Sequence, residues 1–199
     1  MTHRRLLTAG GGLALAVLLA IGLIQLAGRA GSGTVAPTVK LTAAQMRSQL
    51  AGSPAPLAAL HAQASELLPG GATALRARLA ALHGWPVVIN KWASSCEPCK
   101  AEFGAFQQVS LELGHRVAFI GIDSGDDPRA EPLRFLKSFP VSYPSYYDPS
   151  GQLGVQATDS TFTPVTVIYN RAGEKYIHQG AYPSAAKLRH DVEFYGLHA

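Results

Sequence analysis

The chain has two cysteines, Cys96 and Cys99, and their C-x-x-C spacing is the feature of the sequence best suited to chemistry. A disulfide across so short a loop removes little entropy from the unfolded chain, so it would be a poor structural brace. The same spacing is typical of thiol pairs that alternate between dithiol and disulfide. We therefore expect a redox-active disulfide that needs no further cofactor.

Two other uses of a C-x-x-C motif fit this sequence poorly. A structural zinc ion needs four ligands, whereas the chain has no second cysteine pair and its 7 histidines are scattered singly. Covalent haem attachment requires a histidine directly after the second cysteine, and Lys100 stands there. We therefore expect no metal.

A helix predicted from Pro98 to Leu113 would hold the two cysteines in different settings. Cys96 would lie at its N-terminus, where free N–H groups and the helix dipole stabilise a thiolate, the reactive form of cysteine. Cys99, one helical turn further on, would sit deeper. Cys96 is thus the expected nucleophile and Cys99 the resolving thiol, and Pro98 suits a first helical turn because it lacks an N–H group.

The remaining elements are predicted from apolar patterns and turn residues. A buried strand at 85–90 leads into the motif, and further strands are expected at 117–122, 145–148, 165–169 and 174–178. Other helices are expected between 57 and 83, at 131–139 and at 184–194. This order predicts an α/β fold, a mixed sheet with helices on both faces. Core positions are expected for Tyr143, Tyr146 and Tyr147, and surface or structural roles for His61 and His178.

The run 87–103 resembles the thioredoxin-like reductases of the TlpA and ResA group. It contains Trp92-Ala93, then Cys96-Glu97-Pro98-Cys99-Lys100, then Glu102-Phe103. The resemblance extends from about residue 84 to the C-terminus and includes Thr163-Pro164 and the turn 170–173, whereas the N-terminal half matches less well. It implies a thioredoxin fold and protein disulfide reductase activity.

The resemblance also implies roles for residues around the cysteines. Pro164 would be a cis-proline beside the C-x-x-C pair, and Thr163 would present its backbone to a substrate, with Glu97 and Pro98 also at the substrate contact. Glu102 would be a buried proton acceptor for Cys99. The alternative interpretation is that Glu102 is a solvent-exposed residue of the helix.

Three positions modify what the resemblance implies. Asn90 stands where thioredoxins proper have a buried acid, which shifts the acid–base role toward Glu102. Ser95 replaces the usual tryptophan before the first cysteine, so an apolar wall beside the nucleophile is missing. The negative charge of Glu97 would disfavour the Cys96 thiolate and make the dithiol more reducing.

The N-terminus has the pattern of a membrane anchor. Residues 6–27 carry no charge and are long enough to cross a bilayer, and Arg4 and Arg5 before them predict a cytoplasmic N-terminus. We expect a cytoplasmic tail at 1–5, a transmembrane helix at 6–27, a linker at 28–53 and an extracytoplasmic thioredoxin-like domain at 54–199. A signal peptide cleaved near 28–30 is the alternative.

The predicted function is reduction of protein disulfides outside the cytoplasm. Substrates would be exported cysteine-containing proteins, such as apocytochromes c by the resemblance, and a membrane electron donor would reduce the pair again. The alternatives are an oxidant that donates disulfides to exported proteins and a binding module without turnover. The 17 basic residues against 13 acidic ones are too few and too scattered to indicate nucleic-acid binding.

Overall fold

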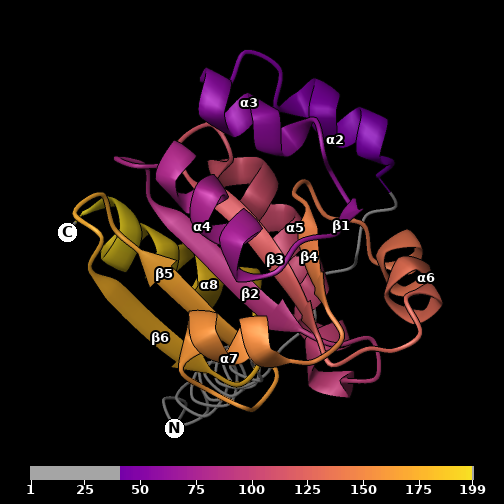
Figure 1. The fold of residues 1–199 in the computed structure, drawn as a ribbon. Coiled ribbons are helices and arrows are strands. Elements are labelled where there is room, and N and C mark those ends of the chain that lie inside the picture. Colours follow the sequence, from indigo (N-terminus) through magenta and orange to yellow (C-terminus); the bar gives the residue numbers. More distant parts are fainter. Residues whose placement is uncertain (1–40, 199) are drawn as a thin grey trace, which may run out of the picture. The chain divides into compact units, whose positions relative to one another are not determined.

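The computed structural model describes residues 41–198, which form a six-stranded sheet covered by helices (Figure 1). The expected cytoplasmic tail and transmembrane anchor, and the first part of the expected linker, lie outside the described residues. Among residues 41–198, no helix is both long and apolar enough to cross a membrane.

The sheet is mixed, as the sequence predicts, with strand order β1-β4-β3-β2-β5-β6. Strands β1, β4, β3 and β2 are parallel to one another, β5 pairs antiparallel with β2, and β5 and β6 form the antiparallel hairpin. The strands are β1 (Leu67–Leu68), β2 (Val87–Trp92), β3 (Ala118–Ser124), β4 (Ser145–Asp148), β5 (Val165–Tyr169) and β6 (Lys175–Gln179). Every residue of β2 is buried because it is a central strand covered on both faces.

Alternate residues of β2 point to two separate apolar cores. Val88 and Trp92 belong to the core under α5 (Glu97–Leu113), α6 (Ala130–Ser138) and α8 (Ala185–Asp191), which continues as a π-helix, Val192–Leu197. Val87 and Ile89 belong to the core under α3 (Ala55–His61), α4 (Ala72–Ala81) and α7 (Gln152–Thr158). The helix that carries the cysteines is therefore packed on a strand fixed from both sides.

The folded domain begins earlier than residue 54. Helix α2 (Ala43–Gln49) lies inside the range expected to be linker and starts with a capping box formed by Thr42 and Gln45. Met46 is fully buried and Leu50 is 2% exposed. Burial of these two side chains identifies 43–49 as part of the domain, so the linker boundary predicted at 53 is wrong.

Two short elements were not expected from the sequence. Strand β1 contains two residues and exists through its pairing with β4, where Leu67 lies beside Ser145. Helix α7 follows Gly151, which adopts a φ of 70° that favours glycine. Both are too short for a periodic pattern. Tyr143 and Tyr146 are buried as expected.

Candidate active site

Aromatic packing fixes the end of β2, from which the cysteine motif emerges. The Trp92 ring stacks on Phe135 at 4.7 Å and meets Phe103 edge to face at 5.3 Å between ring centroids. Its Nε1 donates a hydrogen bond of 3.1 Å to Ser145 Oγ. A turn at Ser94–Ser95 then reverses the chain into α5. The cysteine motif therefore follows a strand end whose position is fixed by these contacts.

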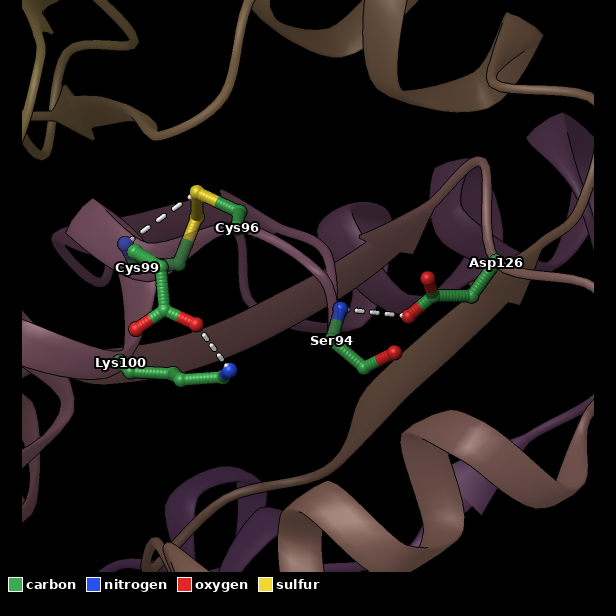
Figure 2. Close-up of polar contacts among 6 residues, drawn as sticks. Ser94, Cys96, Cys99, Lys100 and Asp126 are labelled. Atoms are coloured by element: carbon green, nitrogen blue, oxygen red, sulfur yellow. Dashed lines mark hydrogen bonds and ion pairs between the residues drawn. A yellow bond between two sulfur atoms is a disulfide. The ribbon is translucent and has the colours of Figure 1, made fainter.

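The two cysteines form a disulfide with a Cα–Cα distance of 5.2 Å (Figure 2). Cys96 is the N-cap of α5, and the Cys99 N–H donates a hydrogen bond of 3.2 Å to the Cys96 sulfur. Cys96 is half-buried, whereas Cys99 is fully buried. Cys96 is therefore the sulfur that a partner can reach, and its position at the helix N-terminus is of the kind that favours a thiolate.

Glu97 and Pro98, between the cysteines, are both exposed on the surface of the motif. Glu97 forms an ion pair with Lys100 one turn later, and the dashed line from Lys100 in Figure 2 marks it. The ammonium group of Lys100 therefore lies close to the carboxylate charge that Glu97 places near Cys96.

Glu102 is fully buried on the same helix, three residues after Cys99, so the exposed alternative is wrong. Its Oε1 accepts a hydrogen bond of 2.8 Å from Asn90 Nδ2, and its Oε2 accepts one of 2.9 Å from the Tyr182 N–H. Burial raises the pKa of Glu102 to about 7, although both hydrogen bonds favour the ionised form. A carboxyl group with this pKa exchanges protons readily at neutral pH.

The Thr163–Pro164 peptide bond is cis, which confirms the expectation for Pro164. Strand pairing sets Lys91 of β2 beside Val165 of β5 in antiparallel register. The residues after Lys91 and those before Val165 therefore lie at the same edge of the sheet. Thr163 is half-buried and Pro164 is buried there, at the edge from which the cysteine motif emerges.

Two buried carboxylates beside the motif were missed from the sequence. Asp126 Oδ2 accepts a hydrogen bond of 2.6 Å from the Ser94 N–H, at the turn before Cys96 (Figure 2). Asp123, fully buried at the end of β3, has a pKa raised to about 9 by burial and by the charges of Asp126 and Asp148. Both aspartates occur where a parallel strand ends, and this position in the sequence is the feature that could have identified them.

Replacing Asp126 with alanine is expected to lower the free energy of unfolding of the oxidised protein by about 1 kcal/mol, because the Ser94 N–H loses a charged acceptor. Urea unfolding at pH 7 measures it. Asp126→Asn retains an acceptor oxygen and is the control. Equal stability of the alanine and asparagine variants would show that the hydrogen bond contributes nothing.

Within residues 41–198, no cluster of histidine, cysteine, aspartate and glutamate side chains is arranged to hold a metal ion. The reactive atoms that the described site offers are the two sulfurs and the Glu102 carboxyl group. A half-buried thiol, a fully buried thiol and a carboxyl group that titrates near neutral pH can together carry out dithiol–disulfide exchange.

Comparison with known proteins gives sequence similarity to ResA. The thiol-disulfide oxidoreductase ResA of Bacillus subtilis is 31% identical over 100 residues, which cover 50% of this chain and 55% of ResA. ResA of Oceanobacillus iheyensis is 29% identical over 76 residues, 38% of this chain and 40% of that protein. The chain thus spans about half the length of the curated relatives it matches. No protein-family model matches it.

A solved structure supports the fold. The thiol:disulfide interchange protein of the thioredoxin family from Chlorobium tepidum has a TM-score of 0.50 and 21% identity, over 57% of this chain and 81% of that one. At this identity the likeness concerns the fold alone. The chain thus has a thioredoxin-like fold with a Cys96–Cys99 disulfide, and its sequence is similar to thiol-disulfide oxidoreductases of the ResA type.

Proposed function

We propose that the protein is a membrane-anchored thiol:disulfide oxidoreductase that reduces disulfides of exported proteins outside the cytoplasm. The observation that carries the proposal is the asymmetric pair at the start of α5, a half-buried Cys96 joined to a fully buried Cys99. The similarity to ResA proteins supports the activity.

The first half of the reaction belongs to Cys96. In the dithiol form, its thiolate attacks one sulfur of a substrate disulfide, the substrate S–S bond breaks, and the other substrate sulfur leaves as a thiolate. The product is a mixed disulfide between Cys96 and the substrate. The N–H of Cys99, which lies 3.2 Å from the Cys96 sulfur, stabilises the thiolate before the attack.

The second half belongs to Cys99 and Glu102. The Cys99 thiol gives its proton to the Glu102 carboxylate and attacks the Cys96 sulfur. The Cys96–Cys99 disulfide forms, and the second substrate sulfur leaves as a thiolate, so two electrons have passed to the substrate. Glu97 and Pro98 are exposed and Thr163 is half-buried near this edge of the sheet, which supports their contact with the substrate beside Pro164.

The direction and location rest on the N-terminal sequence. The uncharged run 6–27 after Arg4 and Arg5 would hold the domain outside the cytoplasm, where disulfides form readily. A reductase there needs electrons from inside, so its partner is a membrane thiol donor. Its substrates are cysteine-containing exported proteins, and apocytochrome c before haem attachment is one such substrate.

The reduction potential of the Cys96–Cys99 couple tests the direction. We would equilibrate the domain with glutathione or dithiothreitol buffers and quantify the oxidised fraction. A reductase should have a potential near the roughly −270 mV of thioredoxin or lower, whereas a value near the roughly −120 mV of DsbA would make the protein an oxidant. A non-catalytic binding module would bind its partners unchanged when both cysteines are replaced by serine.

A further inference from the structure

A row of three polar side chains crosses the sheet on the face covered by α5 and α8, and it begins next to Glu102. Asn90 of β2, which donates to Glu102 Oε1, pairs with Thr166 of β5, and Thr166 pairs with His178 of β6. Side chains directly opposite in an antiparallel pair point to the same face, with Cβ atoms about 4.5–5.5 Å apart. The row therefore leads from the buried carboxyl group to β6, the edge strand of the sheet (Figure 1).

Each member of this row has a polar atom without a hydrogen bond. Asn90 Oδ1, Thr166 Oγ1 and His178 Nε2 are buried and have no partner within residues 41–198. Asn90 and Thr166 are at most 1% exposed, whereas His178 is half-buried, so the row runs from the interior toward solvent. Buried polar atoms are normally satisfied by a protein group or by bound water. Three such atoms on neighbouring strands indicate a common site for bound water.

The second hydrogen bond of Glu102 leads to the same histidine. Glu102 Oε2 accepts from the Tyr182 N–H, and the Tyr182 ring stacks on His178 with 3.9 Å between the ring centroids. This stacking holds the imidazole at the end of the row. Both oxygens of the carboxyl group are therefore bonded to residues whose neighbours include His178 or Thr166.

The ionisable groups around the row differ in their ability to exchange a proton near neutral pH. Burial lowers the pKa of His178 and Lys187 adds to this, whereas Asp191 and the backbone of the following loop oppose the shift. The neutral imidazole can therefore accept a proton and pass one on. Burial raises the pKa values of Tyr143 and Tyr182, whose hydroxyl groups also interact with the Glu102 charge, so both stay protonated.

We propose that Thr166 and His178, with water bound between their side chains and Asn90, form the path by which Glu102 exchanges its proton with solvent. This inference rests on the proposed function, in which Glu102 takes the Cys99 proton. The carboxyl group then gives a proton to the bound water, the Thr166 hydroxyl and water pass one to His178 Nε2, and the imidazolium releases one to solvent. The carboxylate is restored, and no charge stays in the interior.

Carbon-13 NMR would measure this proton exchange without turnover. The full-length oxidised protein, in detergent micelles, would carry the label at the carboxyl carbons of its glutamates, and the Glu102 resonance is the one that Glu102→Gln removes. Relaxation dispersion at the midpoint of its pH titration gives the rate at which the protonated and ionised forms interconvert. The variants are Thr166→Val, which removes only the hydroxyl group, and His178→Gln.

Two control variants match these substitutions. Thr158→Val removes a hydroxyl group that is equally buried but belongs to α7, which packs on the opposite face of the sheet. His190→Gln replaces an exposed histidine of α8. Thr166→Ser keeps the hydroxyl group of the row and tests whether that group, rather than the shape of the side chain, is needed.

Thr166→Val and His178→Gln should each slow the exchange about 10²-fold, the lower range of what a positioned proton-transfer group contributes. Thr166→Ser and both controls should exchange at the wild-type rate. Unchanged exchange in Thr166→Val or His178→Gln, or equal slowing in a control, would overturn the path while the oxidoreductase activity stands. A full-length wild type that reduces neither glutathione disulfide nor the disulfides of insulin would overturn the proposed function itself.

Discussion

Cys99→Ser is expected to accumulate as a covalent complex with its substrate. Cys96 keeps its half-buried position and its helix N-terminus, so it still attacks a disulfide and forms the mixed disulfide. The second thiol is then missing, and release depends on an external thiol. Because an intramolecular thiol acts at a far higher effective concentration than one in solution, turnover should fall by roughly 10³-fold. Non-reducing gel electrophoresis and mass spectrometry would detect the adduct.

The control is Cys96→Ser, which leaves only the sulfur of Cys99. That sulfur is fully buried, so this variant should form no adduct and should have no measurable turnover. Adducts formed by Cys96→Ser but not by Cys99→Ser would reverse the assigned roles of the two sulfurs.

Glu102→Gln is expected to abolish a pH dependence of both stability and rate. Burial raises the pKa of Glu102 in the folded protein from an ordinary 4.5 to about 7. Between these values the folded state binds more protons than the unfolded state, so stability falls as pH rises from about 4.5 to about 7. Glu102 should contribute a loss of about 3 kcal/mol over this interval in the oxidised wild type, and Asp123, whose pKa is also raised, adds to the decline.

The glutamine variant should lack the Glu102 contribution because its side chain does not titrate, so its decline should be smaller than that of the wild type by about 3 kcal/mol. It is also well matched to the site. Asn90 Oδ1 has no hydrogen-bond partner in the described part of the chain. Rotation of the Asn90 amide would let this oxygen accept from the glutamine N–H, while the Tyr182 N–H keeps an oxygen acceptor. Urea unfolding of the oxidised protein at several pH values measures the effect.

The rate at which Cys99 resolves the mixed disulfide shows whether Glu102 accepts a proton or is only a buried structural residue. If Glu102 takes the Cys99 proton, Glu102→Gln should slow this step about 10²-fold at pH 7 and remove an inflection near the pKa of Glu102. Stopped-flow single-turnover kinetics would follow it. Glu112→Gln, at an exposed position of the same helix paired with Arg189, is the control. An unchanged rate in Glu102→Gln would leave Glu102 with a structural role alone.

Sequence patterns were most informative where elements are long or make turns with characteristic residues. Helix α5 was predicted within one residue because its apolar residues recur at helical spacing over four turns and Gly114 follows it. The β5–β6 hairpin was predicted because Gly173 supplies the positive φ that its turn needs. Helix α2, strand β1 and helix α7 were missed, since each is short and depends on contacts with distant residues.

For the candidate site, the sequence by itself determined the chemistry. The spacing of Cys96 and Cys99 at the start of a predicted helix identifies the reactive pair and predicts the order in which its two sulfurs act.

Tertiary structure alone decided the environment of the two cysteines. Burial of Glu102 depends on α5 packing against β2 and on the backbone of Tyr182, which is 80 residues away in the chain. The hydrogen bonds from the Ser94 N–H to Asp126 and from Lys91 Nζ to the Ser160 carbonyl oxygen likewise join segments that are distant in the sequence. Local sequence patterns do not predict such contacts, because the contacts depend on how the sheet brings distant segments together.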